Sequence, residues 1–485
     1  MVTVDALFKA INDEKLRVDT DLIRLAFDFA NEAHASQTRK NGDLYITHPL
    51  QTAITLAKLH LDQDTIIAGL LHDVPEDTNR TLSEIEKKFG KDVAKLVEGI
   101  TKLGKLKYRG IERYIENLRK MFVAMASDIR VIFIKFADRL HNLQTLDVLD
   151  PAKQERIARE TLEIYAPIAN RLGIWQLKGQ LEDLSFKYLY PKEYADLTEQ
   201  LDKNFSERQA LLAHLKSRVR TALKQEQIPV MEISGRNKDL WSLYRKLHRH
   251  DNDLERIHDI MALRIIVPNI ADCYKTLGVI HRLWLPMPNR LKDYIAQPKP
   301  NGYRSLHTTI FCDHGKTMEI QIRTLEMQRT AEFGIAAHWH YDEKGSVQLD
   351  KKLDWVQELA KWQAEIQDSQ KYLDSLKIDV FQDRIFVFTP KGDVIDLPER
   401  STPVDFAYHI HSRIGDTATS ARVNNKIASL DTPLHSGDMV EIITDKNRKG
   451  PNMDWLNFVK TRAARDHIKT NAQKSIWATI KNFRK

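Results

Sequence analysis

Apolar positions recur at helical spacing through the first 195 residues. One stripe comprises Leu22, Leu25, Ala26, Phe29, Ala30 and Ala33, and we expect His34 to close this helix as a cap or core residue rather than a ligand. Further apolar helices are predicted after His48-Pro49, over Thr65 to Leu71, and over Val131 to Leu140. The pattern therefore indicates an all-α first region.

Beyond residue 195 the pattern changes. Charged helical segments over 196–228 are expected to be a connector, and strands alternate with helices over 229–345. Period-2 alternation over Met318 to Arg323 places Glu319, Gln321 and Arg323 on one face of a strand, for which a solvated edge strand is the ordinary explanation.

The last third of the chain divides into three segments. Residues 346–377 form a predicted helical linker with a packing stripe of Trp355, Leu359 and Trp362. Short strands and a helix over Val404 to Ile410 make 378–445 a small α+β module, and 446–485 is basic and partly helical. The whole is a multidomain α+β protein.

Composition says more about the protein's cellular location than about its function. The net charge of +7 favours acidic ligands such as nucleotides or RNA, although a solvated basic surface explains it about as well. Two cysteines exclude a disulfide framework and a cysteine zinc site, which fits a reducing, cytoplasmic location. No apolar run approaches ~18 residues, and the N-terminus lacks a secretory signal pattern.

The most informative stretch is Leu70 to Thr78, where His72-Asp73 ends an apolar helix. Pro75 lacks an N–H and disfavours a helical residue before it, so we expect the helix to end near Val74 and Glu76-Asp77 to lie in a loop. Thr81-x-x-Glu84 predicts a capping box for the next helix, which should stop at Gly90.

Two further segments, His48-Pro49 and Asp138 to Asn142, support the interpretation of His72-Asp73 as part of a metal site. His48, His72, Asp73 and Asp138 would supply two nitrogens and two oxygens to a divalent ion, with Glu76 and Asp77 as outer or general-base groups. An ion pair of Asp138 with Arg139 or Arg171 is the structural alternative. The basic loop Thr38 to Asp43 could cradle phosphates or be a plain turn. The pattern favours metal-assisted phosphoester hydrolysis without naming a substrate.

A second constellation suggests a nucleotide site. A strand ending at Gly235 would lead into a basic helix start, suited to phosphate, with a solvated helix as the alternative. Asp259 could face Glu319 across one Mg²⁺. The segments Arg290 to Ile295 and Lys299 to His307 combine cations with Tyr303, whose ring can stack on a base for ~1–3 kcal/mol.

Together these motifs resemble the long RelA/SpoT homologue family of bifunctional guanosine tetra/pentaphosphate hydrolase–synthetases, in that family's domain order. The motifs are His72-Asp73…Glu76-Asp77-Thr78, Phe136 to Leu143, Asp293 to Ala296, Asn301 to Thr308 and Glu319 to Thr324. The resemblance implies an all-α HD-type hydrolase domain over 1–195, a nucleotidyltransferase-like synthetase domain over 229–345 and a ubiquitin-like TGS domain over 378–445.

The resemblance also implies roles for single residues. In the hydrolase, His48, His72, Asp73 and Asp138 would bind Mn²⁺, Glu76 and Asp77 would orient water, and Arg39, Lys40, Asn142 and Thr145 would hold the nucleotide. In the synthetase, Asp259 and Glu319 would bind Mg²⁺, with Glu319 as candidate base for the ribose 3′-OH, and Tyr303 would stack on guanine. GDP or GTP would be surrounded by Lys299, Asn301 and His307. ATP would be engaged by Arg236, Lys238 and Arg264. In the third domain, His411 would contact the tRNA acceptor end.

One loop agrees with a subgroup of the family, whereas other positions depart from the family's pattern. Arg290-x-Lys292-Asp293 is similar to the basic loop of bifunctional members. Pro75 and Gly42-Asp43-Leu44-Tyr45 depart from the family's pattern, and the chain stops soon after Asp454 to Asn457, where long members continue into regulatory domains.

The implied function is synthesis of (p)ppGpp from ATP and GDP or GTP, and hydrolysis of (p)ppGpp. Because running both reactions at once would only consume ATP, we hypothesise that the connector favours one active conformation at a time. The alternatives are a hydrolase with an inactive synthetase, and a tRNA- or ribosome-binding regulator with idle catalytic sites.

Overall fold

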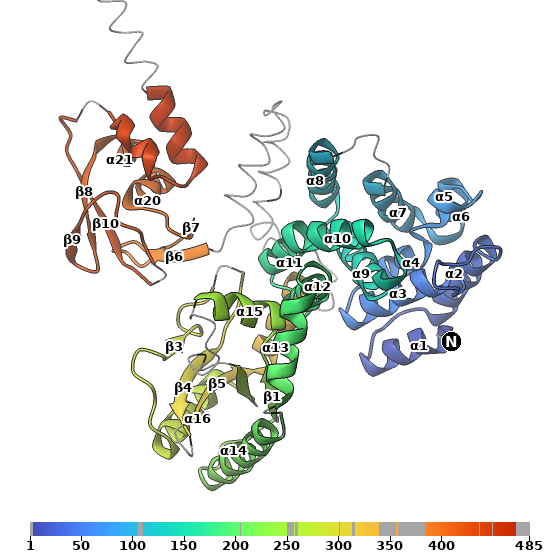
Figure 1. The fold of residues 1–485 in the computed structure, drawn as a ribbon, viewed down its shortest axis with the longest axis horizontal. Helices are drawn as coiled ribbons and strands as arrows, with labels where there is room; N and C mark the ends of the chain where they lie inside the picture. The colour runs from blue at the N-terminus through green and yellow to red at the C-terminus, as the bar shows by residue number, and fades with distance from the viewer. Residues whose placement is uncertain are drawn as a thin grey trace, which may run out of the picture. The chain divides into compact units, whose positions relative to one another are not determined.

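The structure is a computed structural model that describes residues 3–104, 110–203, 205–249, 257, 260–299, 301–312, 316–338, 356, 384–435, 437–448 and 450–471 (Figure 1). The chain divides into two compact units, Met1–Glu365 and Ile366–Lys485. None of the described helices combines the length and the apolar character that a membrane-spanning helix needs. The predicted linker stripe at Trp355, Leu359 and Trp362 lies outside the described residues.

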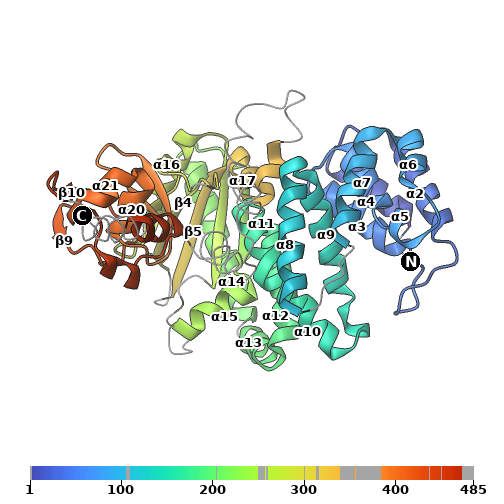
Figure 2. The same ribbon diagram turned by 90° about the horizontal axis from the view of Figure 1, so that it is seen from above.

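The first part of the first unit is all helical, as predicted, and is coloured blue to teal in Figures 1 and 2. Its elements are α1 (Val4–Asp13), α2 (Thr20–Ala33), α3 (Thr47–Lys58), α4 (Gln63–Leu71), α5 (Val74–Asp77), α6 (Leu82–Phe89), α7 (Lys91–Gly104), α8 (Gly110–Ser127), α9 (Arg130–Gln144), η1 (Leu146–Val148), α10 (Pro151–Glu160), the π-helical turn η2 (Thr161–Tyr165), α11 (Ala166–Arg171) and α12 (Trp175–Leu189). Helices α3 and α4 are buried along most of their length, and α9 buries ten of its side chains.

Several local predictions in this region are confirmed. His34 is the C-cap of α2, the helix after His48-Pro49 is α3, and Thr81 and Glu84 form a capping box on α6, which ends at Gly90. The stripe on α2 is wrong at one position, because Leu25 is 45% exposed while Ile23 is fully buried. A stripe drawn at average helical spacing does not say which flanking residue turns inward.

The loop predicted for Glu76-Asp77 is also wrong. These residues belong to the single-turn helix α5, which Asp73 precedes as N-cap and in which Pro75 occupies the first turn. Proline is tolerated there because a first-turn N–H has no intrahelical acceptor in any case. Pro75 therefore begins a new helical turn instead of leaving the chain irregular.

The second part of this unit contains a five-stranded sheet and its flanking helices. The elements are α13 (Pro191–Lys203), α14 (Phe205–Gln225), β1 (Glu232–Asn237), α15 (Leu240–Arg249), β2 (Met261–Val267), α16 (Ile270–Leu283), β3 (Lys292–Asp293), β4 (Leu306–Phe311), β5 (Thr317–Thr324), α17 (Leu325–Phe333) and η5 (Gly334–His338). The strand order is β1-β2-β5-β4-β3, in which β2 and β5 are parallel and the other neighbours antiparallel.

The two faces of this sheet differ in character. Ile233, Leu263, Ile320 and their neighbours on one face form an apolar core with α14 and α16. Residues 196–228, predicted as a connector, thus include a helix whose Leu212, Leu215 and Val219 pack in that core. Strand register brings Arg236, Arg264, Gln321 and His307 onto the opposite, polar face.

Two strand predictions are corrected by this sheet. Strand β5 is central rather than at an edge, and its polar face is largely covered, with Gln321 5% and Arg323 1% exposed. Gly235 does not end its strand but lies inside β1, where a Cβ would overlap the side chain of Leu212. A glycine inside a strand marks such a close approach.

The helical and sheet parts of the first unit meet at two glycines. Gly334 has a positive φ of +56°, and a Cβ there would overlap the backbone of Leu172 and Gly173. Ile335 donates its N–H to the Leu172 carbonyl at 3.1 Å. This junction therefore requires glycine for both its conformation and its space.

The second unit is a small α+β module, as predicted. It comprises β6 (Arg384–Phe388), β7 (Val394–Pro398), α20 (Pro403–Ile410), α21 (Ser412–Thr417), β8 (Ala418–Val423), β9 (Lys426–Ala428), β10 (Val440–Thr444) and η6 (Met453–Asn457). Trp455, Val459, Ala464 and Ile468 pack against α20. The buried Asp405 accepts hydrogen bonds from the backbone N–H groups of Thr402, Lys460 and Thr461. One carboxylate thus joins the start of α20 to the segment that follows η6.

Candidate functional site

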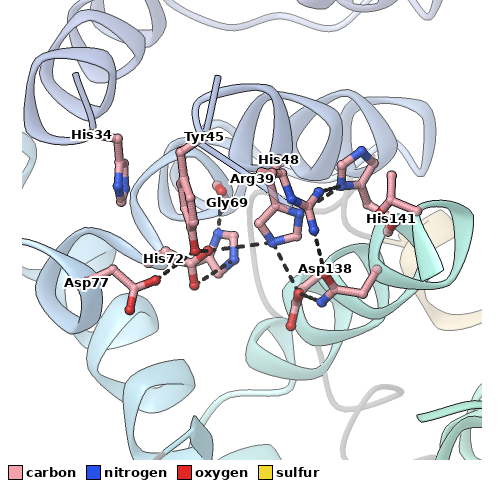
Figure 3. A network of polar contacts seen from close by, with 12 residues as sticks. His34, Arg39, Tyr45, His48, Gly69, His72, Asp77, Asp138 and His141 are labelled. Atoms are coloured by element: carbon pink, nitrogen blue, oxygen red, sulfur yellow. Dashed lines mark hydrogen bonds and ion pairs between the residues drawn. The ribbon is translucent and has the colours of Figure 1, made fainter. Parts of the chain in front are cut away.

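The four predicted metal ligands of the helical region lie together in the structure (Figure 3). His48 is in the first turn of α3, His72 and Asp73 lie between α4 and α5, and Asp138 comes from α9. His48 Nε2 lies 3.3 Å from Asp138 Oδ1 and 3.5 Å from Asp73 Oδ2, and His72 Nε2 lies 3.2 Å from Asp73 Oδ1. Three helix ends and one helix face thus converge on one point.

We call His48, His72, Asp73 and Asp138 the donor cluster. Both of its imidazoles turn Nε2 inward because Nδ1 has another partner. His72 Nδ1 lies 2.8 Å from the carbonyl oxygen of Gly69, to which it can only donate. His48 Nδ1 lies 2.8 Å from His141 Nδ1. A hydrogen bond at one ring nitrogen selects the tautomer and leaves the other nitrogen as a potential ligand.

Charge in the donor cluster is unevenly distributed. Burial opposes ionisation of Asp138, but Lys135 and His48 hold the pKa of its carboxyl group well below the ordinary value. Burial would lower the pKa of His72, yet Asp73 and Asp138 raise it to about 9. Asp138 is therefore ionised, and His72 is an imidazole at which positive charge is favoured.

These residues fit a divalent cation. His48, His72 and Asp138 are buried and their ligand atoms lie within 4.8 Å of one another. Despite its nearness to Asp73, His72 Nε2 is buried and has no hydrogen-bond partner within the described part of the chain. A buried nitrogen of this kind is costly unless something binds it. Mixed imidazole and carboxylate donors suit transition metals.

Tyr45 closes one side of the cluster and was not predicted as a site residue. Its hydroxyl donates to Asp77 Oδ2 at 2.7 Å and lies 3.0 Å from Asp73 Oδ2. Its ring stacks on His34, with ring centroids 4.5 Å apart. Burial and these two carboxylates raise the pKa of Tyr45, which stays protonated. Asp77 is thus held near the cluster, and Glu76 lies beside it on α5.

His141 is a second residue near the donor cluster that sequence reasoning missed. Besides His48, its Nδ1 contacts Arg39 Nη1 at 2.9 Å, and Arg39 Nη2 donates to Asn142 Oδ1 at 3.1 Å. Burial, and then the charges of His48 and Arg39, lower the pKa of His141 to about 3. The ring is therefore neutral, and the single lone pair on its Nδ1 is the shared acceptor for the N–H groups of Arg39 and His48. Its position three residues after Asp138 on α9 was the available signal.

The remaining residues predicted for the hydrolase substrate lie around this group. Asn142 donates to Asp138 Oδ1, Thr145 Oγ1 donates to the His141 carbonyl, and Lys40 is exposed in the loop beside Arg39. Of the two residues proposed to pair with Asp138, Arg139 instead contacts Glu160 and Tyr165. Asp138 forms an ion pair with Lys135, whose Nζ lies 2.7 Å from Asp138 Oδ2.

The sheet region has two neighbouring cavities on its polar face. The larger, of about 560 Å³, is lined by Arg236, Arg264, Tyr303, Arg323 and residues of α12. The smaller, of about 200 Å³, is lined by Arg236, Lys238, Lys299, Tyr303, His307, Glu319 and Gln321. Arg323 is 1% exposed and its Nε has no hydrogen-bond partner among the described residues. The cavities thus present cations and a few acceptors, as an anionic nucleotide requires.

Most residues predicted for nucleotide binding line these cavities. Tyr303 is buried, and Lys299 Nζ lies 5.2 Å from its ring centroid. Asn301 accepts the N–H of Tyr303, and Lys292 lies on β3, exposed and not among the lining residues. Asp259, the predicted partner of Glu319, lies outside the described residues.

Helix α12 contributes residues that the sequence did not suggest. Trp175 lines both cavities, and Lys178 and Asp183 line one each. Asp183 accepts the N–H of Trp241 at 2.9 Å, so a carboxylate occupies the start of α15, where phosphate binding was expected. Burial raises the pKa of Asp183 to about 6. Nothing in the local sequence of α12 indicates these contacts, because they join segments about 60 residues apart.

In the second unit, His411 is exposed at the start of α21. Its Nδ1 accepts the N–H of Arg413 at 3.1 Å, which makes it the N-cap of that helix. The capping bond uses Nδ1 and sets the orientation of the ring at the surface.

The fold and the sites define a class of protein with three recognisable regions. Residues 26–175 match the HD domain, residues 235–346 match the region found in RelA/SpoT proteins, and residues 385–444 match the TGS domain. HD-domain hydrolases are metal-dependent, in agreement with the donor cluster.

The chain belongs to the RelA/SpoT homologue family. It is 49% identical over 455 residues to a probable guanosine-3′,5′-bis(diphosphate) 3′-pyrophosphohydrolase of Synechocystis, covering 92% of this chain and 60% of that protein. It is 47% identical to a GTP pyrophosphokinase of Myxococcus xanthus, covering 93% of this chain and 60% of that protein. It is 46% identical to the bifunctional (p)ppGpp synthase/hydrolase SpoT of Escherichia coli, covering 92% and 64%. The chain thus spans about 60% of the length of these relatives.

Among solved structures, the chain is similar to the small alarmone synthetase 1 of Bacillus subtilis bound to its product pppGpp. The two are 27% identical with a TM-score of 0.25, over 36% of this chain and 99% of that one.

Proposed function

We propose that this chain makes and degrades (p)ppGpp at two separate sites. The donor cluster on α3, α4 and α9 would carry hydrolysis, and the polar face of the sheet would carry synthesis. The observation that supports this most is that one chain holds both a buried imidazole–carboxylate cluster and two cation-lined cavities. The names of its relatives include both activities.

For hydrolysis, His48, His72, Asp73 and Asp138 would hold one Mn²⁺. When bound, this ion would supply Lewis acidity toward the phosphate and toward water. Asp77, fixed by Tyr45, and Glu76 would orient the attacking water. Arg39, Lys40, Asn142 and Thr145 would bind the nucleotide, and the products would be GDP or GTP and pyrophosphate.

For synthesis, the ribose 3′-oxygen of GDP or GTP would attack the β-phosphorus of ATP. The new 3′-O–P bond forms as the bond from the β-phosphorus to the AMP oxygen breaks, and Glu319 takes the 3′-OH proton. Arg236, Lys238 and Arg264 would bind ATP. Tyr303, Lys299, Lys292, Asn301 and His307 would bind the guanine nucleotide, and Glu319 with Asp259 would hold Mg²⁺. Catalysis of this type depends on positioning and charge neutralisation.

The second unit would bind uncharged tRNA, with the exposed His411 at the acceptor end, and together with the basic tail would contact the ribosome. Its match to the TGS domain supports this assignment. The small number of cysteines, both free and buried, fits a cytoplasmic enzyme.

The test is a pair of assays on the purified chain. With ATP, GDP and Mg²⁺ we expect AMP and ppGpp in equal amounts, and with ppGpp and Mn²⁺ we expect GDP and pyrophosphate. Hydrolysis without synthesis would contradict the proposed synthesis reaction and leave only the proposed hydrolysis. A chain inert in both assays that still binds tRNA would overturn it.

A further inference from the structure

Three side chains on the polar face of the sheet form a continuous hydrogen-bonded chain. The Tyr303 hydroxyl lies 2.7 Å from His307 Nε2, and His307 Nδ1 lies 2.6 Å from Glu319 Oε1. Tyr303 is 7% exposed, and His307 and Glu319 are 15% and 20% exposed. Both hydrogen bonds are thus largely shielded from water, where they are stronger and more directional.

The register of β4 and β5 accounts for this arrangement. His307 on β4 pairs with Gln321 on β5, so Glu319 is its diagonal neighbour on the same face of the sheet. Tyr303 precedes β4 and turns back over His307, with ring centroids 5.7 Å apart. Two rigid strands therefore hold the imidazole and the carboxylate in fixed relative positions.

The direction of each hydrogen bond follows from the chemistry of the groups. An ionised carboxylate only accepts, so His307 Nδ1 must donate to Glu319. A neutral imidazole that carries its proton on Nδ1 has its lone pair on Nε2, which is therefore an acceptor. The Tyr303 hydroxyl must then donate to Nε2.

We propose that His307 is a positioning residue for Glu319 and that the Tyr303 hydroxyl fixes the His307 tautomer that this requires. The inference rests on the proposed synthesis reaction, in which Glu319 accepts the 3′-OH proton. Tyr303 then has two separable roles: its ring face binds guanine, and its hydroxyl, through His307, sets the orientation of Glu319. A single side chain thereby links guanine stacking to the position of the general base.

The hydrogen bond also bears on the geometry of the proton transfer. His307 engages Oε1, which restricts rotation of the carboxylate. In the proposed reaction the other oxygen, Oε2, would take the proton of the 3′-OH. A general base must lie within hydrogen-bond reach of the proton that it removes. Without His307 the carboxylate can adopt other rotamers, and the rate should fall more than nucleotide affinity.

Tyr303→Phe tests this directly, because it keeps the ring and removes only the hydroxyl. We expect kcat for synthesis to fall about tenfold while the KM and the directly measured Kd for GDP stay within about twofold. Tyr294→Phe is the matched control, since the Tyr294 ring also lies beside His307, at 5.4 Å, and it should leave both constants unchanged. Tyr303→Ala should additionally raise the Kd for GDP.

Two further measurements separate positioning from simple structural damage. His307→Asn can still donate toward Glu319, so its kcat should lie between those of the wild type and His307→Ala. In ¹⁵N-histidine NMR without nucleotide, we expect His307 to be the Nδ1–H tautomer in the wild type and a tautomer mixture in Tyr303→Phe.

Three results would overturn the proposal. They are an unchanged kcat in Tyr303→Phe, equal kcat values for His307→Asn and His307→Ala, or an Nε2–H tautomer in the wild type. A wild-type chain that makes no ppGpp would instead contradict the proposed function, and the NMR measurement would still decide whether the hydrogen-bonded chain exists.

Discussion

Single atoms decide what the donor cluster can do, because each histidine has two different ring nitrogens. The donor residue types were predictable from His48, His72-Asp73 and Asp138 in the sequence. The tautomer of His72 depends on a carbonyl three residues earlier, whereas that of His48 depends on His141, 93 residues away. The sequence therefore indicated the candidate ligands but could not indicate the residue that orients one of them.

Replacing His141 tests that orienting role. His141→Ala removes the Nδ1 partner of His48 and should weaken Mn²⁺ binding and ppGpp hydrolysis by about 10- to 100-fold, the usual cost of losing such a partner. Metal content by mass spectrometry and the rate of GDP release measure this. His60→Ala is the control, because His60 pairs with Glu14 outside the cluster. Full metal affinity in His141→Ala would contradict the assignment.

Lys299 predicts a pH dependence for the nucleotide site. Burial, and then Lys292, lower the pKa of Lys299 to about 8, so its charge is present below pH 8 and lost above it. The KM for GDP should therefore rise as the pH increases from 7 to 9, because a neutral amine no longer attracts phosphate. Lys299→Arg keeps its charge throughout this range and should show a flat profile. Parallel profiles for the two proteins would exclude Lys299 as the cause.

At the scale of elements, spacing predicted the helices better than it predicted their ends. The capping box on α6 and the helix after His48 follow from local rules. The misplaced loop at Glu76-Asp77 and the misjudged edge strand β5 have a different origin. A turn of helix after Pro75 and a covered polar strand face both depend on what packs around them, which single-sequence periodicity does not contain.

The glycine junction offers an element-scale prediction. Gly334→Ala should destabilise the first unit by at least ~2 kcal/mol, because its positive φ and its contact with the Leu172 backbone both exclude a Cβ. Gly278→Ala, on the exposed face of α16 with no atom near the added methyl group, should instead stabilise by up to ~1 kcal/mol. Calorimetric melting of both variants checks the sign of each change. Equal effects of the two substitutions would contradict this account of the junction.

At the scale of the whole chain, the three regions and their order were predictable. The first two regions carry dense motifs, and the third shows a pattern of short strands and one helix. The position of α12 was not, although it supplies Trp175, Lys178 and Asp183 to the cavities of the sheet region. Such contacts between distant segments leave no local pattern. Asp259, the predicted Mg²⁺ ligand of the synthetase site, lies outside the described residues.

Helix α9 suggests how the two sites could communicate. It carries Asp138 of the donor cluster, and its last residue, Gln144, lines the larger cavity. We expect a non-hydrolysable ATP analogue to change the rate of ppGpp hydrolysis at least twofold, and Gln144→Ala to reduce that change. Initial hydrolysis rates with and without the analogue measure it. Rates that are independent of the analogue would show that the sites do not communicate.

The central claim is that one chain carries two opposing activities at separate sites. The most direct measurement compares both reaction rates in His72→Ala and Glu319→Gln. We expect His72→Ala to lose ppGpp hydrolysis and keep synthesis, and Glu319→Gln to lose synthesis and keep hydrolysis. Loss of both activities in each folded variant, or loss of neither, would contradict the claim.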